Sequence, residues 1–173
     1  MREWIPISTS PKGRLALAAV KEFGTRPFDE VTVGELAAAA SVTTGALYHH
    51  FDSKLGLYSF MREDIERRLL DRMEGAAAAA ENEADRSVAV RAALLVGFDF
   101  AVREGFLHIL GAPPAGAEHD RLAEMLTALT APASPVLGQL LAAAWRAALS
   151  AVAEGSEPGQ ARAALLALEV VRV

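Results

Sequence analysis

Residues 44–51 include two side chains whose types and spacing suit contact with nucleic acid. Thr44 and Tyr48 are four positions apart, so a helix over this segment places both on one face. A Thr hydroxyl and methyl group and a Tyr phenol can each reach base edges in the major groove of DNA. Gly45 allows the backbone to approach closely. Since the segment contains no Lys, Arg, Asn or Gln, it predicts base reading through thymine methyl groups and DNA shape, with Arg or Lys from other segments as a further source.

Two histidines, His49 and His50, follow in the same segment. Adjacent helical residues diverge by about 100°, so this pair is poorly placed to hold one metal ion. The chain also has no Cys to complete such a site. We expect one histidine to face DNA phosphate and the other to pack at the domain surface, and we expect no metal and no other cofactor.

Lys54 lies just beyond this segment, at the start of the next expected helix. A cation in the first turn opposes the helix dipole, so a carboxylate would be the more stable choice there. This choice indicates an anionic partner, and a DNA phosphate contacted together with Tyr48 or His50 would be one. The alternative is a solvated lysine with no partner.

The elements that position these residues begin with a pattern written twice, eleven residues apart. Each copy has a Thr that can cap free helix amides, an apolar residue before it and another apolar residue four positions after it. The copies are Val31, Thr32 and Leu36, and then Val42, Thr43 and Leu47. Glu35 strengthens the first copy because it completes a capping box with Thr32. Two short helices separated by residues 40–42 predict a helix-turn-helix, with Thr32 and Thr43 as candidate DNA contacts at the helix starts.

Composition predicts an all-α protein, since hydrophobic residues are 52% of the 173 residues and Ala and Leu dominate them. We expect a three-helix DNA-binding domain over residues 1–53 and a helical ligand-binding and dimerisation domain over residues 54–173. The first helix should begin at Ser10 and Pro11 and end at Gly24. The other expected helices are 33–40, 44–51, 53–80, 87–102, 103–110, 118–130, 134–154 and 158–173, with breaks at 81–85 and 111–116.

The net charge of −5 is distributed unevenly along the chain. Residues 1–60 contain six Lys or Arg and six Asp or Glu, so the excess acid lies beyond them. A neutral DNA-binding unit predicts modest non-specific affinity, to which helix N-termini and dimerisation contribute. No uncharged apolar run of about 18 residues and no signal-peptide core are present, so we expect a soluble cytoplasmic protein. The absence of Cys excludes disulfides, thiolate zinc sites and cysteine nucleophiles.

Residues 14–58 resemble the DNA-binding domain of TetR-family transcriptional regulators. The resemblance rests on Thr-Val-Gly-Glu-Leu-Ala at 32–37 and on Thr-Gly-Ala-Leu-Tyr-His-His-Phe-Asp-Ser-Lys at 44–54. It implies a homodimer whose amino-terminal units sit in successive major grooves of an operator. It also implies that the carboxy-terminal helices bind a small effector, which separates the two units and releases the DNA. Under this resemblance Lys54 takes the family's role at phosphate.

The carboxy-terminal half carries no motif, but its large or polarisable side chains could line a cavity for a mainly apolar effector. These candidates are Phe98, Asp99, Phe106, His108, Met125 and Trp145. Ordinary core packing is the alternative for the apolar members. Asp99, between two Phe residues, is either a buried carboxylate that faces a ligand or an exposed one.

We expect the last two helices to form the dimer interface, because each carries a stripe of small or branched apolar residues. The stripes are Leu137, Leu141, Ala144 and Ala148 in the first helix, and Leu165, Leu168 and Val171 in the second. Packing within one subunit is the alternative.

The sequence thus favours a ligand-responsive repressor that binds a pseudo-palindromic operator as a homodimer, while activation remains open. Family members often have a polar or basic residue where this chain has Val33 and Gly34. This departure and the neutral charge motivate an alternative, a helical ligand-binding or scaffolding protein with a vestigial helix-turn-helix. An enzyme is not expected, because the chain has no Gly-rich phosphate loop, no metal cluster and no Ser with an assignable base.

Overall fold

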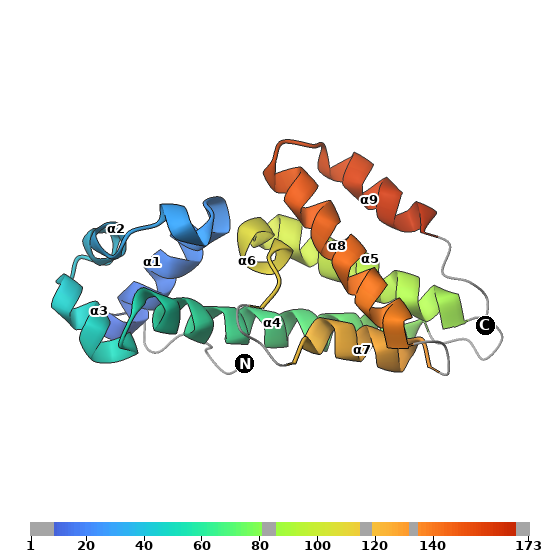
Figure 1. Cartoon of the computed structure of the whole chain (residues 1–173), viewed down its shortest axis with the longest axis horizontal. Helices are drawn as coiled ribbons and strands as arrows, with labels where there is room; N and C mark the ends of the chain where they lie inside the picture. Colours follow the sequence, from blue (N-terminus) through green and yellow to red (C-terminus); the bar gives the residue numbers. More distant parts are fainter. Residues whose placement is uncertain (1–8, 81–85, 115–118, 132–134, 169–173) are drawn as a thin grey trace. The chain divides into compact units, whose positions relative to one another are not determined.

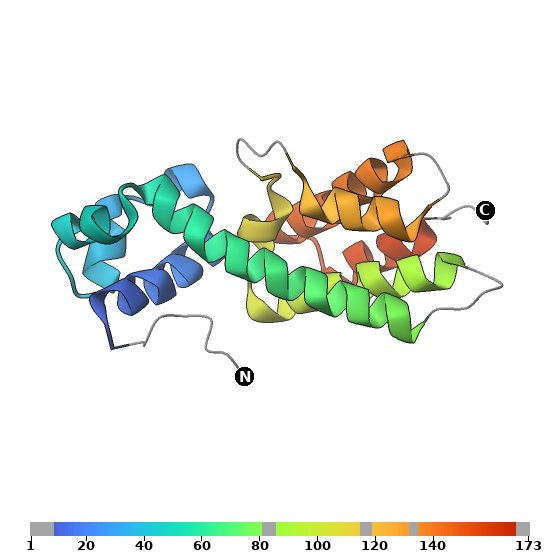
Figure 2. The same cartoon turned by 90° about the horizontal axis from the view of Figure 1, so that it is seen from below.

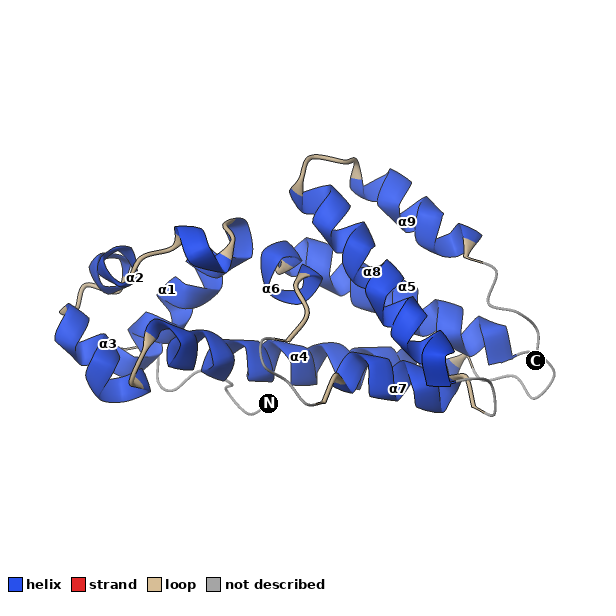
Figure 3. Ribbon diagram, in the orientation of Figure 1, coloured by secondary structure: helices blue, strands red, loops and turns tan. Residues whose placement is uncertain are grey.

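The computed structural model describes residues 9–80, 86–114, 119–131 and 135–168. Within these ranges the chain forms helices joined by loops and turns, without a strand (Figures 1 and 3). This confirms the all-α class. The helices are α1 Pro11–Thr25, α2 Val33–Ala39, α3 Thr44–Phe51, α4 Lys54–Ala79, α5 Arg86–Glu104, α6 Leu107–Gly111, α7 Arg121–Leu129, α8 Pro135–Ala153 and α9 Pro158–Ala167, and a short 3₁₀ helix, η1, covers Phe28–Glu30.

Most helix limits agree with the sequence prediction, and the differences have local causes. α1 continues one residue past Gly24, because the Thr25 hydroxyl donates to the carbonyls of Lys21 and Glu22. α6 begins only at Leu107, after Gly105 with its φ of +73°. The expected break at 81–85 and residues 115–116, 118, 134 and 169–173 of other expected segments lie outside the described residues. The last helix is shorter than predicted, because α9 ends at Ala167 and Leu168 is extended.

The chain divides into two compact units, Met1–Glu66 and Arg67–Val173, and the division falls inside α4. The sequence places the boundary at 53 and 54, where α4 begins. The first turns of α4 group with the amino-terminal unit, in which Leu57, Tyr58 and Met61 are buried.

The amino-terminal unit packs α1, α2 and α3 around one another, and these are the dark blue to cyan helices in Figure 2. Leu15, Phe23, Leu36 and Leu47 are almost fully buried at its centre. The ring of Tyr58 in α4 packs edge-on against Phe23, with the ring centroids 5.1 Å apart. The apolar stripe of α1 therefore forms the core that holds the two shorter helices.

The carboxy-terminal unit is centred on α8, which packs against α5, α6, α7 and α9. Trp145 of α8 is fully buried and its indole N–H donates to the Leu94 carbonyl at 3.0 Å. α7 and α8 approach closely at Gly138, where a Cβ would lie 2.5 Å from the backbone nitrogen of Thr127. Arg146 forms a bidentate ion pair with Asp120, at 2.6 and 2.7 Å.

One stretch, Val136–Ala153 of α8, is long and apolar enough to cross a membrane by length and composition, with a mean hydropathy of 1.5. Core helices of soluble proteins also meet this criterion. Arg146 interrupts the stretch with a buried ion pair, and Trp145 and Leu149 are buried within the unit. The stretch is 33% buried, so packing within the unit accounts for the apolar residues of its buried side only.

Candidate nucleic-acid interface

The doubled helix-start pattern forms the predicted capping contacts. The Thr32 hydroxyl accepts from the Glu35 amide at 3.2 Å, and the Glu35 carboxylate accepts from the Thr32 amide at 2.7 Å, which completes the capping box. The Thr43 hydroxyl accepts from the Ala46 amide, also at 3.2 Å. Between the two helices, Ser41 takes a positive φ of 52°, which turns the chain sharply. The helix-turn-helix is thus fixed by local hydrogen bonds.

α3 has one buried side and one open side. Leu47 and Phe51 are buried in the unit, whereas Tyr48 is 52% exposed. His50 is half-buried, and its ring centroid lies 5.0 Å from that of His49. The exposed positions of α3 and its cap are Thr43, Thr44, Gly45, Tyr48 and His49. Within this unit, these five predicted DNA contacts therefore lie on a surface that the core does not use.

Lys54 has partners inside the unit, and this corrects the reasoning that singled it out. Its ammonium donates to the carbonyls of Phe28 and Val31, at 3.0 and 2.9 Å, and lies 4.1 Å from the centroid of the Phe28 ring. The cation is therefore satisfied without an external anion. A phosphate contact by Lys54 stays a prediction, but its position at a helix start no longer argues for one.

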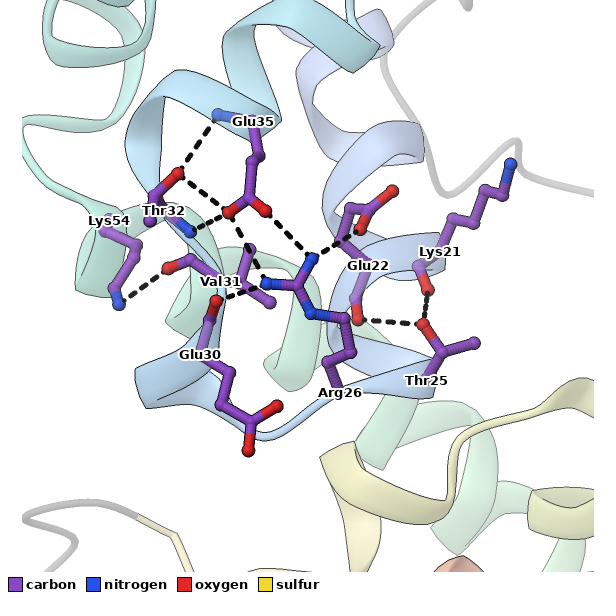
Figure 4. A network of polar contacts seen from close by, with 9 residues as sticks. All are labelled: Lys21, Glu22, Thr25, Arg26, Glu30, Val31, Thr32, Glu35 and Lys54. Carbon is purple, nitrogen blue, oxygen red and sulfur yellow. Dashed lines mark hydrogen bonds and ion pairs between the residues drawn. The ribbon is translucent and has the colours of Figure 1, made fainter.

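A polar network joins the end of α1 to the start of α2 (Figure 4). Arg26 donates to both carboxylate oxygens of Glu35, at 3.1 and 3.4 Å, and to the Glu30 carbonyl. The Thr32 hydroxyl also donates to Glu35, at 2.7 Å. Hydrogen bonds from the Thr32 hydroxyl, from Arg26 and from the Thr32 amide lower the pKa of Glu35 from 4.5 to about 2. Glu35 is therefore an ionised anchor for the start of α2.

The lowered pKa of Glu35 predicts a stability difference that depends on pH. A carboxyl whose folded pKa lies below its unfolded value stabilises the fold above the unfolded pKa, and this contribution disappears as pH falls through the folded pKa. The Glu35→Gln variant keeps a capping-box side chain but has no charge. We expect wild type to have a higher Tm than Glu35→Gln at pH 6, with the gap narrowing between pH 4.5 and about 2. Thermal melts at several pH values measure this, and a gap that is constant with pH would contradict it.

Two further basic residues contact the helix-turn-helix and the start of α4, and the sequence does not predict these contacts. Arg14 of α1 donates through Nε to the carbonyl of Ala40, at 2.9 Å, where α2 ends. Lys12 lies over the rings of Phe51 and Phe60, at 5.6 and 4.9 Å from their centroids. No local pattern signals these contacts, because the partners are distant in sequence.

The residues predicted to bind an effector are not all equally accessible. Phe98, Phe106 and Trp145 are buried side chains of the core, and Asp99 forms an ion pair with Arg162 of α9 at 2.9 Å, with both side chains well exposed. Asp99 therefore takes the exposed one of its two alternatives. His108 and Met125 are half-buried. Within the described ranges, no group of three His, Cys, Asp or Glu side chains could hold a metal ion.

The predicted dimer stripes lie mainly on the inner sides of their helices. Leu141, Ala148 and Leu165 are buried within the unit, and Leu137, Ala144 and Leu168 are partly exposed. Val171 lies outside the described residues. The open side of α8 instead presents Val136 and Leu140, which are 54% and 62% exposed, with Ala143 and Ala147 one and two turns further on. α8 is apolar on nearly all sides, so its periodicity could not distinguish the inner face from the outer one.

Comparison with known proteins agrees with this geometry. The model of the family described as "Bacterial regulatory proteins, tetR family" matches residues 16–59. The nucleoid occlusion factor SlmA of Idiomarina loihiensis is 35% identical over 108 residues, which are 62% of this chain and 53% of that protein. The HTH-type transcriptional activator FasR of Mycolicibacterium smegmatis is 33% identical over 89 residues, which are 51% of this chain and 39% of that protein. The chain thus spans about half the length of SlmA and less of FasR.

The similarity extends to the fold of the whole chain. A TetR-family transcriptional regulator from Pectobacterium atrosepticum has a crystal structure that matches with a TM-score of 0.67 and 26% identity, covering 90% of this chain and 89% of that one. The matched model covers the helix-turn-helix unit, and the structural match also covers the helical unit that follows it. Residues 16–59 therefore form a DNA-binding domain of the tetR family of bacterial regulatory proteins, and the chain has the fold of a TetR-family transcriptional regulator.

Proposed function

We propose that this chain is a cytoplasmic transcriptional regulator that binds a pseudo-palindromic operator as a homodimer. The observation that carries the proposal is the division of α3 into a buried side, with Leu47 and Phe51, and an exposed side with Thr44, Tyr48 and His49. A helix anchored along one side and polar along the other suits insertion into a major groove.

The exposed side of α3 supplies the proposed DNA contacts. Thr44 and Tyr48 read base edges, and Gly45 brings the backbone close to the duplex. A Cβ on Gly45 would meet only the Thr43 hydroxyl, at 3.7 Å, so the position is open to a partner. Thr32 and Thr43 cap the starts of α2 and α3, and His49 and His50 lie in the last turn of α3; these four residues are the proposed phosphate contacts.

The exposed apolar sides of α8 and α9 supply the proposed dimer interface. Val136 and Leu140 of α8 and Leu166 of α9 are large apolar side chains that are more than one-third exposed. Solvent-exposed apolar patches of this kind mark interaction sites, and a second copy of the chain would cover both helices as a four-helix interface. Leu140→Glu is expected to convert the dimer to a monomer in sedimentation experiments, and an unchanged dimer would contradict this interface.

The carboxy-terminal unit is the proposed site of the response to an effector. A small, mainly apolar effector would bind in the carboxy-terminal unit and release the DNA. His108 and Met125 are the best placed of the six candidates, because they are half-buried. Contact with Phe98, Phe106 or Trp145 requires these core side chains to move, and contact with Asp99 requires it to leave Arg162.

Selection of DNA from a randomised duplex library, followed by footprinting, tests the proposed function. We expect the full-length protein to select a pseudo-palindrome with half-sites about one helical turn or more apart, and to protect it in a salt-sensitive manner. Failure to select any sequence at low salt would leave the vestigial helix-turn-helix alternative in place.

A second candidate function follows from the similarity to SlmA, which is described as a nucleoid occlusion factor. Under this alternative the chain binds DNA at sites that do not control adjacent genes. Genome-wide mapping of binding sites, combined with transcript levels in a deletion strain, separates the two. Sites at promoters whose genes change expression support a regulator, and the sign of the change distinguishes repression from activation.

A further inference from the structure

The two side chains of α3 that can become positively charged are adjacent histidines. α3 spans Thr44–Phe51 and contains no Lys or Arg, and His49 and His50 lie in its last turn. Histidine ordinarily changes its charge between about pH 5 and pH 8. Protonation therefore determines whether the side chains of the helix proposed to enter the major groove carry a positive charge.

Neither imidazole has a polar partner in the part of the chain that the structure describes. No hydrogen bond or ion pair reaches either ring there. The ring centroids of His49 and His50 lie 5.0 Å apart, and those of His50 and Phe51 lie 6.4 Å apart. His49 is exposed and His50 is half-buried. A protonated imidazole has two N–H donors, so the pair can offer donors to an anion outside the protein.

Within the described ranges, no charged residue on the elements around α3 pairs with either histidine. α1 and α2 pack against α3, and the first turns of α4 follow it. Arg14 and Lys54 donate to backbone carbonyls, and Glu35 pairs with Arg26. The other charged residues on these elements are Lys12, Lys21 and Glu22 of α1, and Arg62, Glu63, Asp64 and Glu66 of α4, with Asp52 between α3 and α4. Among the described residues, therefore, no carboxylate competes with a phosphate for a protonated imidazole.

We propose that DNA binding is coupled to proton uptake by His49 and His50, so that the affinity for the operator rises as pH falls from about 8 to about 6. A phosphate that accepts a hydrogen bond from a protonated imidazole favours the charged form of the ring. Protonation strengthens DNA binding to the same extent, because the coupling between two ligands is reciprocal. The inference rests on the proposed DNA binding by a dimer and adds a regulation of that same surface.

The closeness of the two rings limits the uptake to about one proton for each subunit. Two positive imidazoles with centroids 5.0 Å apart repel each other, so the second protonation is disfavoured. His49 is the better candidate for the charged member because it is exposed. His50 is half-buried and precedes Phe51, whose ring centroid lies 5.6 Å from the Lys12 ammonium. A dimer with two α3 helices then takes up about two protons.

Proton uptake by the dimer has two measurable consequences. The affinity rises by about tenfold or more between about pH 8 and pH 6, since each subunit contributes one charged contact. Each protonated histidine at a phosphate also releases a counterion and contributes about 0.9 to the slope of log K against log salt. The slope is therefore steeper at pH 6 than at pH 8 by about 2 for a dimer.

The experiment measures the affinity of the full-length protein for a duplex that wild type selects from a randomised library, at several salt concentrations and at about pH 8 and pH 6. We expect wild type to bind about tenfold or more tightly at pH 6, with the steeper salt slope. The variant His49→Gln/His50→Gln keeps hydrogen-bonding side chains that cannot be charged, so its affinity and slope should not change with pH. Equal affinities and slopes for wild type at both pH values would overturn the inference, and so would a pH dependence that persists in the double variant.

The matched control removes the other two of the four histidines, in the variant His108→Gln/His119→Gln. Both residues lie in the carboxy-terminal unit. His119 is exposed, with its Nδ1 3.2 Å from the Glu124 carboxylate, and His108 is half-buried in α6. This variant should keep the pH dependence of wild type. If it loses that dependence, the coupled protons bind outside α3 and the inference is wrong.

A fixed cation tests the same inference without a change at the half-buried His50. The variant His49→Lys carries its charge at both pH values, and its position is exposed. We expect it to bind the duplex about tenfold or more tightly than wild type at pH 8, with a salt slope that is steeper by about 2. Affinity and slope equal to those of wild type at pH 8 would contradict the inference. Failure of wild type to select any duplex would instead contradict the proposed function, so the two failures are distinguishable.

Discussion

Replacing Gly56 with Ala is expected to destabilise the amino-terminal unit by about 3 kcal/mol, at the upper end of the usual cost of overpacking. Gly56 lies in the first turn of α4, and a Cβ there would come within 2.0 Å of the Phe51 carbonyl oxygen and 3.2 Å of its carbon. These are backbone atoms, which cannot rotate away as a side chain would. The turn from α3 to α4, where Asp52 has a φ of 63°, would have to open and displace the buried ring of Phe51.

Thermal melts of Gly56→Ala measure this effect, and Gly75→Ala is the matched control in the same helix. Gly75 is exposed in the carboxy-terminal part of α4, and a Cβ there would meet nothing within 4 Å. Ala is favoured over Gly inside a helix, so Gly75→Ala should stabilise the protein by about 1 kcal/mol. The two substitutions are chemically identical and have opposite expected signs. Equal Tm values for the two variants would contradict the close approach of α4 to the end of α3.

Replacing Asp120 with Ala is expected to destabilise the carboxy-terminal unit by about 3 kcal/mol or more. Arg146 is only 8% exposed and would remain buried without its bidentate partner. The substitution also removes the cap of α7, where Asp120 accepts from the Ala123 amide at 3.1 Å. Burial alone raises the pKa of Asp120, but the bonds from Arg146 and from backbone amides outweigh it, and the net pKa lies below its usual value. The stabilising effect of this pair should therefore weaken in acid.

The double variant Asp120→Ala/Arg146→Met separates the loss of a contact from the cost of a buried charge. Replacing both members of a buried ion pair by apolar groups is often close to neutral, whereas removing one member is costly. We expect the double variant to be more stable than Asp120→Ala alone in urea unfolding followed by far-ultraviolet circular dichroism. A double variant that is less stable than Asp120→Ala would show that the buried charge of Arg146 does not destabilise the protein when Asp120 is absent.

The sequence predicts those parts of the fold that depend on near neighbours. The capping box of Thr32 and Glu35 spans three residues, and the cap at Thr43 likewise acts within one helical turn. These local signals predicted α2 and α3 to within one residue, together with the turn between them. The four-residue spacing of Thr44 and Tyr48 predicted a shared face of α3, and both residues are exposed.

The sequence does not predict contacts between residues that are far apart along the chain. Arg14 and Ala40 are 26 residues apart, as are Lys54 and Phe28, and Arg146 and Asp120. No periodicity links such partners, so the position of Lys54 at a helix start suggests an unsatisfied cation although two carbonyls accept from its ammonium. The open face of α8 was missed for a different reason, because a helix that is apolar nearly all round gives no contrast between its inner and outer sides.

The most direct test of the account is the affinity of Tyr48→Ala for the duplex that the wild-type protein selects. Tyr48 is 52% exposed on α3, so its truncation should leave the circular dichroism spectrum and the Tm unchanged. Leu17→Ala is a suitable control, since Leu17 is 42% exposed on α1 and has no proposed contact with DNA. The account predicts that the affinity of Tyr48→Ala is about 10-fold weaker, which corresponds to the loss of one base contact. It predicts no change in affinity for Leu17→Ala. Wild-type affinity in a folded Tyr48→Ala protein would contradict the claim that α3 reads the operator.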